Sequence, residues 1–344
     1  MRVSMYYSNN DVRLEEMPVP QIGPGELLMR VEASGICGSD VMEWYRIHRV
    51  PMVLGHEVAG VVVEVGEGVS RYKVGDRIIA AHHVPCNTCH YCLSGSHTVC
   101  DTLRKTNFYP GGFAEYIRLP GINVDRGTFT LPEGVSFEEG TFVEPVACVL
   151  RGLRKAGLKL GCGVLVIGSG IAGLLHVRLS RALGAGRVVA TDTLKHRLEA
   201  ALKFGADAAF YAEDDVPDCT RKVNDGRLAG LVIVCTGAKD AIEQAFKCVD
   251  RDGTVLFFAP TVPGVTLSLS INDIFWRNEI TLATSYAGSP ADHAVALELI
   301  AARTMCVKEM ITHRLSLAET GLGFSMVAHP ETYNSLKVII EPQR

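Results

Sequence analysis

The chain has 344 residues, a formal net charge of −4 and a hydrophobic content of 47%. This length is sufficient for two domains with separate cores, and the composition is that of an ordinary soluble globular protein. The small negative charge argues against a nucleic-acid surface, and the apolar stretches are too short to span a membrane. Nothing resembling a signal peptide opens the chain, so we expect a cytoplasmic protein with reduced thiols.

The first 150 residues predict a β-barrel-like lobe. They are rich in valine, glycine and proline, and short alternating runs occur at residues 26–32 and 58–65. Alternation with a period of two indicates strands that bury one face. A capping box at Ser136 and Glu139 indicates that a helix begins there, and a proline directly after Glu144 indicates the start of another.

Metal-capable side chains are scattered through this lobe. Cys37, His56 with its neighbour Glu57, and Glu144 are far apart in the sequence. One thiolate, one imidazole and one carboxylate would give zinc three protein ligands and leave the fourth position open, which is the catalytic pattern. Spacing alone does not bring these residues together. Each also fits an ordinary role, as a buried cysteine, a satisfied histidine or a surface carboxylate.

Four cysteines follow within 15 residues in the pattern C-x2-C-x2-C-x7-C. Spacings of two residues allow successive thiolates to turn back onto one tetrahedral ion, and the fourth thiolate closes the shell. An all-thiolate tetrahedron suits zinc and leaves no open position, so we predict a structural zinc site. Disulfides fit poorly, because cytosolic thiols stay reduced. The predicted ligands are Cys86, Cys89, Cys92 and Cys100.

A dinucleotide-binding pattern begins at residue 163. An apolar run at 163–168 predicts a buried parallel strand, and it leads into a G-x-G-x-x-G sequence followed by a helical stretch. The first glycine allows a tight turn, the second lets the pyrophosphate approach the backbone, and the third lets helix and strand pack closely. The helix N-terminus then faces the phosphate charge. The residues predicted to bind the cofactor here are Gly168, Gly170, Ile171, Ala172 and Gly173.

Asp192 ends the next predicted strand, 187–191, and indicates which cofactor binds. Its carboxylate would accept hydrogen bonds from both ribose hydroxyls and would repel a 2′-phosphate, so NAD is favoured over NADP. Lys195 and Arg197 follow closely and reduce that preference, and we include Arg197 among the cofactor-binding residues. Taken alone, Asp192 also fits a simple turn residue at the end of a strand.

Further strands and helices alternate up to about residue 285, so residues 151–285 predict a doubly wound α/β unit. After it come a helical stretch at 294–300 and a last predicted strand at 336–340. The additional strands of the α/β unit are predicted at 208–211, 230–235, 254–258 and 280–284.

These motifs together resemble the zinc-containing medium-chain dehydrogenases, in the same order and across essentially the whole chain. The sequence around Glu144 is similar to the sorbitol (polyol) dehydrogenase branch, in which glutamate takes a place that cysteine holds in classical alcohol dehydrogenases. Besides the four-cysteine and glycine motifs, the resemblance is carried by Gly55, His56, Glu57, Gly60, Val65, Gly66, the segment 113–116, Glu144, Pro145, Ala147 and Cys148.

The resemblance implies a GroES-like β-barrel catalytic domain, residues 1–150 completed by 286–344, and an NAD-binding Rossmann domain, residues 151–285. It implies two Zn²⁺ per chain, the catalytic one held by Cys37, His56 and Glu144, with Glu57 nearby. Relatives are usually homo-oligomers, either dimers or tetramers.

The implied activity is hydride transfer between NAD and a polyol, sugar alcohol or related secondary alcohol, or the corresponding ketone. Ser39 matches the hydroxyl that carries the alcohol proton away, although it also fits a turn residue bonded to backbone. Relatives commonly have a histidine where this chain has Met42, and methionine cannot carry a proton. Two alternatives stay open, a threonine-dehydrogenase-like enzyme acting on an amino alcohol and a non-catalytic cofactor-binding scaffold.

Overall fold

Two separate sheets organise the chain in the computed structural model, which describes residues 1–344. The chain divides into two units, Met1–Ala147 with Ala287–Arg344, and Cys148–Tyr286. Helix α6, Val143–Lys155, carries the chain from the first unit into the second. None of the helices combines the length and the apolar character that crossing a bilayer requires.

The first unit is built on a seven-stranded sheet in the order β15-β16-β3-β5-β6-β8, with β7 also paired to β3. A smaller sheet has the order β2-β1-β4. Strand β3 is buried along most of its length, so it lies at the centre of this unit's apolar core. The strands are β1 Arg2–Ser8, β2 Asp11–Glu16, β3 Leu27–Gly35, β4 Met52–Val53, β5 Glu57–Val65, β6 Arg77–Ala81, β7 Tyr116–Leu119, β8 Thr128–Thr130, β15 Ile311–Ser316 and β16 Lys337–Glu341.

Short helices connect these strands. The predicted capping box is confirmed, because the Ser136 side chain accepts from the Glu139 backbone N–H at 3.2 Å while the Glu139 carboxylate accepts from the Ser136 N–H at 2.9 Å. The helices are α1 Glu43–Arg46, η1 Ile47–Arg49, α2 His90–Leu93, η2 His97–Val99, α3 Asp101–Lys105, α4 Gly121–Arg126, α5 Phe137–Gly140, α12 Pro290–Ala301, η3 Lys308–Met310, η4 Leu317–Glu319, α13 Thr320–Ala328 and α14 Pro330–Tyr333.

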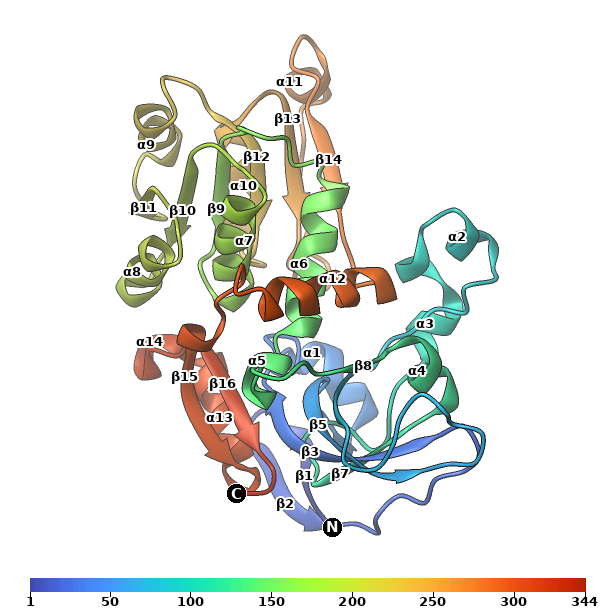
Figure 1. Cartoon of the computed structure of the whole chain (residues 1–344). Helices are drawn as coiled ribbons and strands as arrows, with labels where there is room; N and C mark the ends of the chain where they lie inside the picture. Colours follow the sequence, from blue (N-terminus) through green and yellow to red (C-terminus); the bar gives the residue numbers. More distant parts are fainter. The chain divides into compact units, whose positions relative to one another are not determined.

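The second unit contains the predicted doubly wound sheet, with six parallel strands in the order β11-β10-β9-β12-β13-β14 (Figure 1). Counted along the chain this is the order 3-2-1-4-5-6 of dinucleotide-binding folds. The central strands β9 and β12 are apolar and almost wholly buried, as expected for a parallel sheet covered on both faces. The strands are β9 Val164–Ile167, β10 Val188–Asp192, β11 Ala208–Tyr211, β12 Ala229–Val234, β13 Val249–Phe257 and β14 Thr281–Thr284.

Five helices belong to this second unit. Helix α7 packs on β9 and β10, and α10 packs on β12 and β13. Helix α7 begins directly after β9, so the turn between them contains the predicted cofactor-binding glycines. The helices are α7 Ile171–Ala182, α8 Lys195–Lys203, α9 Val216–Val223, α10 Lys239–Cys248 and α11 Ile271–Phe275.

Candidate metal centres and cofactor site

The four predicted structural ligands converge in a small lobe, which we call the four-cysteine lobe. The Sγ atom of Cys92 lies 3.5 Å from Sγ of Cys89 and 3.9 Å from Sγ of Cys86. The Sγ atoms of Cys100 and Cys86 are 3.6 Å apart. A disulfide would need about 2.05 Å between its sulfur atoms. A regular tetrahedron with Zn–S bonds of about 2.3 Å has edges of about 3.8 Å. The four sulfur positions therefore fit one tetrahedral zinc ion, and four thiolates would fill its coordination shell without an open position.

Backbone amides support the thiolates of this lobe. The Cys89 and Thr88 N–H groups donate to Cys86 Sγ at 3.2 and 3.4 Å, and the Cys86 N–H donates to Cys100 Sγ at 3.4 Å. Hydrogen bonds from Thr88, followed by the one from Cys89, lower the pKa of the Cys86 thiol to about 5. Arg126, at the end of α4, donates to the Cys86 carbonyl at 2.7 Å and ties the loop to that helix. These contacts favour the ionised sulfur that a metal requires.

The other predicted ligands meet at one edge of the large sheet. Gly35 at the end of β3 pairs with Glu57 at the start of β5, so the residues just beyond these ends lie side by side. Cys37 follows β3 and His56 precedes β5. The ligand atoms of Cys37, His56 and Glu57 all lie within 4.8 Å of one another. We call these three residues the sheet-edge site.

The carboxylate in this group is Glu57, which we expected near the metal but outside its ligand shell. Glu144 is not a member of the group. It still lies close enough for its charge to raise the pKa of Glu57, after burial, which is the larger cause. The role of Glu144 as a ligand therefore stays a prediction, while Glu57 has the geometry of a third donor. One thiolate, one imidazole and one carboxylate fit zinc with an open position.

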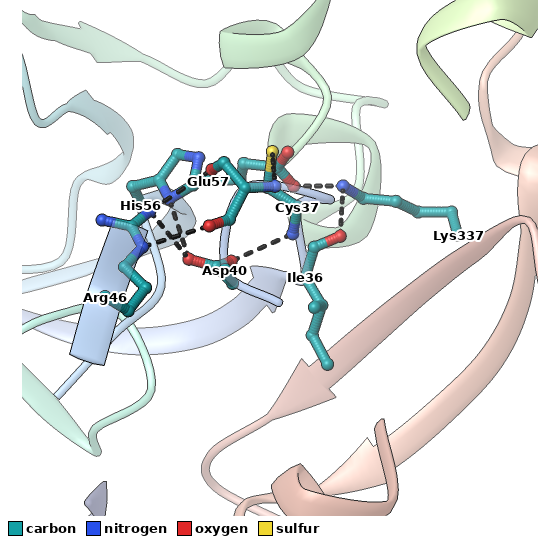
Figure 2. Close-up of polar contacts among 8 residues, drawn as sticks. Ile36, Cys37, Asp40, Arg46, His56, Glu57 and Lys337 are labelled. Carbon is teal, nitrogen blue, oxygen red and sulfur yellow. Dashed lines mark hydrogen bonds and ion pairs between the residues drawn. The ribbon is translucent and has the colours of Figure 1, made fainter. Parts of the chain in front are cut away.

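Asp40 holds this site together, and the sequence analysis did not single it out. The Cys37 backbone N–H donates to Asp40 Oδ2 at 3.0 Å, and His56 Nδ1 lies 3.3 Å from Asp40 Oδ1 (Figure 2). Asp40 is completely buried. Burial disfavours its charge, but His56 and Arg46 outweigh burial and lower the pKa of Asp40. A carboxylate on Nδ1 leaves Nε2 of His56 for a metal, which is the usual arrangement around zinc-binding histidines.

A buried ion pair lies behind Glu57. Lys337 at the start of β16 contacts the Glu57 carboxylate and donates to the Ile36 carbonyl at 3.2 Å (Figure 2). Both charged side chains are at most 1% exposed. A Cβ atom on Gly35 would lie 2.1 Å from Glu57 Oε2 and 2.8 Å from Lys337 Cε, so only glycine leaves room for the pair. No local motif could have revealed Lys337, because 280 residues separate it from Glu57.

Ser39 lies next to the sheet-edge site and contacts Arg46. The Arg46 guanidinium donates to the Ser39 carbonyl at 3.1 Å and to Ser39 Oγ at 3.3 Å. The Ser39 N–H donates to Cys37 Sγ at 3.4 Å. Arg46 is also 3.6 Å from Asp40, and it enters from the side opposite to Lys337 (Figure 2). These contacts fix the position of the Ser39 hydroxyl beside the predicted metal ligands.

Two histidines follow β6 at the same sheet edge. The ring centroids of His82 and His56 are 4.8 Å apart, and those of His82 and His83 are 3.9 Å apart. His83 Nδ1 lies 2.9 Å from the Thr106 carbonyl, which fixes the orientation of that ring. Burial, then the neighbouring His83 and His56, holds the pKa of His82 well below its usual value.

The predicted glycine turn in the second unit has the geometry of a phosphate cradle. Gly168 has a φ of +90°, and a Cβ on Gly173 would lie 1.9 Å from the Gly168 carbonyl oxygen. At Gly170 an added Cβ would make only ordinary contact, 3.7 Å from Arg197. Packing thus does not require glycine at position 170, whereas a bound pyrophosphate does. No side chain caps the N-terminus of α7, where the first N–H groups of a helix have no acceptor within the helix and suit an anion.

Asp192 is fixed at the end of β10. Its carboxylate accepts from the Ser169 N–H at 2.7 Å and from the Leu194 N–H at 3.0 Å. Arg197 lies 3.6 Å from the same carboxylate. The aspartate and the arginine therefore lie together next to the glycine turn. Ile171 and Ala172 supply the first backbone amides of the helix.

Comparisons with known proteins agree with this geometry. Residues 23–126 match the family model described as alcohol dehydrogenase GroES-like domain, and residues 172–302 match the model described as zinc-binding dehydrogenase. The chain is 32% identical to a sorbitol dehydrogenase of Gallus gallus over 332 residues, covering 93% of this chain and 91% of that protein. It is 31% identical to a D-xylulose reductase A of Aspergillus oryzae over 330 residues, covering 92% and 90%.

A solved structure supports the same assignment. The zinc-binding dehydrogenase from Sinorhizobium meliloti 1021 bound to NADP is similar, with a TM-score of 0.88 and 30% identity, and the match covers 99% of each chain. The resemblance inferred from the motifs is therefore confirmed. The chain belongs to the zinc-dependent medium-chain dehydrogenase family, and within it is sorbitol-dehydrogenase-like.

Proposed function

We propose that this protein is an NAD-dependent oxidoreductase with two zinc sites, and that it transfers a hydride between NAD and a polyol, sugar alcohol or related secondary alcohol. The observation that carries the proposal is the sheet-edge site, where three different donor types converge and one coordination position is left for substrate. The sorbitol dehydrogenase and xylulose reductase names of the relatives support the substrate class.

The sheet-edge site would hold the catalytic zinc through Cys37, His56 and Glu57, and Glu144 remains a candidate ligand. Zinc in such a site supplies a Lewis acid that lowers the pKa of an alcohol hydroxyl. Lys337 stabilises the ionised form of Glu57 in the buried wall. The four-cysteine lobe would hold the structural zinc.

Ser39 is the group that we propose to take the alcohol proton. Its Oγ already accepts an N–H from Arg46, which fixes the side chain and leaves a lone pair for the substrate hydroxyl. The next proton acceptor is then ribose or water, since Met42 has no titratable atom. Asp40 keeps His56 in one orientation during this exchange.

The second unit would bind NAD. The amides at the start of α7, including those of Ile171 and Ala172, would face the pyrophosphate. Asp192 would accept the ribose hydroxyls, with Arg197 packed beside it. We assign substrate and both metals to the first unit, and the cofactor to the second. Orientation of the reacting groups and exclusion of water would contribute to the rate enhancement.

We also propose that the protein is a cytoplasmic homo-oligomer, either a dimer or a tetramer. Strand β14 pairs with β13 and ends the sheet order, and Leu282 on it is 42% exposed. Phe275 and Trp276 are 62% and 60% exposed beside it in the chain. An exposed edge strand with apolar neighbours supports pairing with a second copy.

The test is NAD reduction with sorbitol, xylitol, sec-butanol and threonine, before and after treatment with a zinc chelator. Chelator-sensitive NADH formation with a polyol is the expected result. Turnover of threonine alone would support the amino-alcohol alternative instead. Protein that carries two zinc ions per chain and reduces no NAD with any of these would overturn the proposal and favour the binding scaffold.

A further inference from the structure

His82 shares the sheet edge that assembles the predicted metal ligands. In the sheet, Gly35 of β3 pairs with Glu57 of β5, and Glu57 pairs with Ala81 of β6. The residue that leaves β6 at this edge is His82, just as the residue that enters β5 is His56. Their ring centroids are 4.8 Å apart. The position of His82 beside His56 is therefore built into the register of three central strands.

One polar atom of His82, Nδ1, is unsatisfied within the protein, because it is buried and has no hydrogen-bond partner. Its ring neighbours are the imidazoles of His56 and His83, with Phe108 at 6.4 Å. His83 differs, because its Nδ1 faces the Thr106 carbonyl at 2.9 Å. A buried polar group without a partner is energetically unfavourable, so such a group in a site points to a ligand that satisfies it.

We propose that His82 is a specificity-determining residue that hydrogen-bonds a second hydroxyl of the substrate, next to the one that reacts. The inference rests on the proposed function. Vicinal hydroxyls are carried by two carbons that are bonded to each other. When one hydroxyl oxygen lies beside His56, the second hydroxyl is therefore brought toward the ring of His82. The predicted substrate class is therefore narrowed to alcohols with a hydroxyl on the neighbouring carbon.

The chemistry of the ring suits this role. An imidazole ring has two nitrogen atoms that can hydrogen-bond a hydroxyl, and the Nδ1 of His82 has no partner within the protein. An alcohol without the second hydroxyl would leave the ring unsatisfied when it enters the site. Sites built to hydrogen-bond a substrate hydroxyl discriminate strongly against analogues that lack it, for this reason.

The experiment compares the vicinal diol of butane with sec-butanol, which differs by that one hydroxyl. In His82→Phe the ring shape is kept and hydrogen bonding is lost, so kcat/KM for the diol should fall about 10- to 100-fold. The value for sec-butanol should stay within about threefold, and His82→Gln should recover part of the diol activity. His329→Phe, at an exposed histidine, is the matched control.

A second readout does not depend on turnover. Calorimetric titration of the diol into protein saturated with NADH should show weaker binding to His82→Phe than to the wild type, with zinc content unchanged. Equal losses for both alcohols, or no loss in diol binding, would overturn the assignment of His82 while leaving the proposed function intact. A wild-type protein that neither binds nor oxidises the diol or any polyol would overturn both.

Discussion

The four-cysteine lobe and the sheet-edge site both present zinc donors, but they are assembled in opposite ways. The lobe gathers its thiolates from 15 consecutive residues, supported by amides of the same loop. The sheet-edge site takes its parts from the ends of β3, β5 and β16, which meet only when the sheet is in register. A local site depends on local turns, whereas an assembled site depends on the whole unit.

The largest expected effect is the loss of the imidazole donor at the assembled site. In His56→Ala we expect kcat for a polyol to fall about a thousandfold or more, because several kcal/mol of charge stabilisation are lost. Metal analysis should show about one zinc per chain instead of two, with an unchanged circular dichroism spectrum. His97→Ala, in the four-cysteine lobe but outside its ligands, should keep both ions. Full activity in His56→Ala would contradict the assignment of the sheet-edge site.

Removing a donor from the local site should act on stability instead. Cys92→Ser should lose the structural zinc and lower the free energy of unfolding by roughly 3 kcal/mol, which corresponds to a fall of roughly 4–7 °C in Tm for a unit or chain of this size. Activity per folded molecule should change by no more than about twofold. Cys306→Ser, at an exposed cysteine, is the control for thiol loss. If Cys92→Ser abolished turnover at full thermal stability, the division of roles between the two sites would be wrong.

The buried pair behind Glu57 should couple the assembled site to folding. In zinc-free protein, Lys337→Met leaves that carboxylate buried without any counter-charge and should cost about 3–5 kcal/mol. Burial already raises the pKa of Glu57. When the pKa of an acid is higher in the folded than in the unfolded protein, the folded state becomes more stable as the pH falls and the acid is protonated. The deficit should therefore be smaller near pH 5 than near pH 8, as measured by urea denaturation at both values.

Lys308→Met, at an exposed lysine, is the matched control for this charge change and should be nearly neutral at both pH values. A deficit in Lys337→Met that does not change with pH would show that its cause is lost packing rather than the unpaired carboxylate.

The smallest effect is expected at Asp40, which orients a ligand without binding metal itself. Asp40→Asn should weaken zinc binding at the sheet-edge site about 10- to 100-fold, as measured by competition with a chelator. Added zinc should restore much of the activity, which distinguishes this variant from His56→Ala. Unchanged affinity would mean that the 3.3 Å contact with His56 has no orienting role.

The same contrast explains what could be predicted from the sequence. Cys86, Cys89 and their partners follow a spacing that by itself specifies a tetrahedron, and the structure gives sulfur separations that fit it. The turn at Gly168 and Gly173 was equally predictable. The φ of +90° at Gly168 disfavours a side chain, and a Cβ added at Gly173 would lie only 1.9 Å from a carbonyl oxygen. In both regions the physical requirement is contained within one short segment.

The assembled site was only partly predictable. The sequence indicated Cys37 and His56 and placed Glu57 nearby, but it did not indicate that the Glu57 carboxylate would lie within 4.8 Å of both. That proximity depends on the pairing of Gly35 with Glu57, and no spacing encodes a register between distant strands. Asp40 could have been found from the sequence, because it lies only three residues after Cys37. Its carboxylate accepts a hydrogen bond from the Cys37 backbone N–H, as is typical of an aspartate in a turn. Lys337 could not have been found in this way.

The position of β16 in the large sheet has a consequence for biosynthesis. The four-cysteine lobe has all its donors once residue 100 has been translated, so a nascent chain can bind one zinc ion early. The sheet-edge site must wait for β16, the last strand in chain order, because Lys337 neutralises Glu57 only when that strand joins β3. A nascent chain in which β16 has not yet joined the sheet would thus carry all four thiols of the four-cysteine lobe beside a sheet-edge site that still lacks its buried counter-charge.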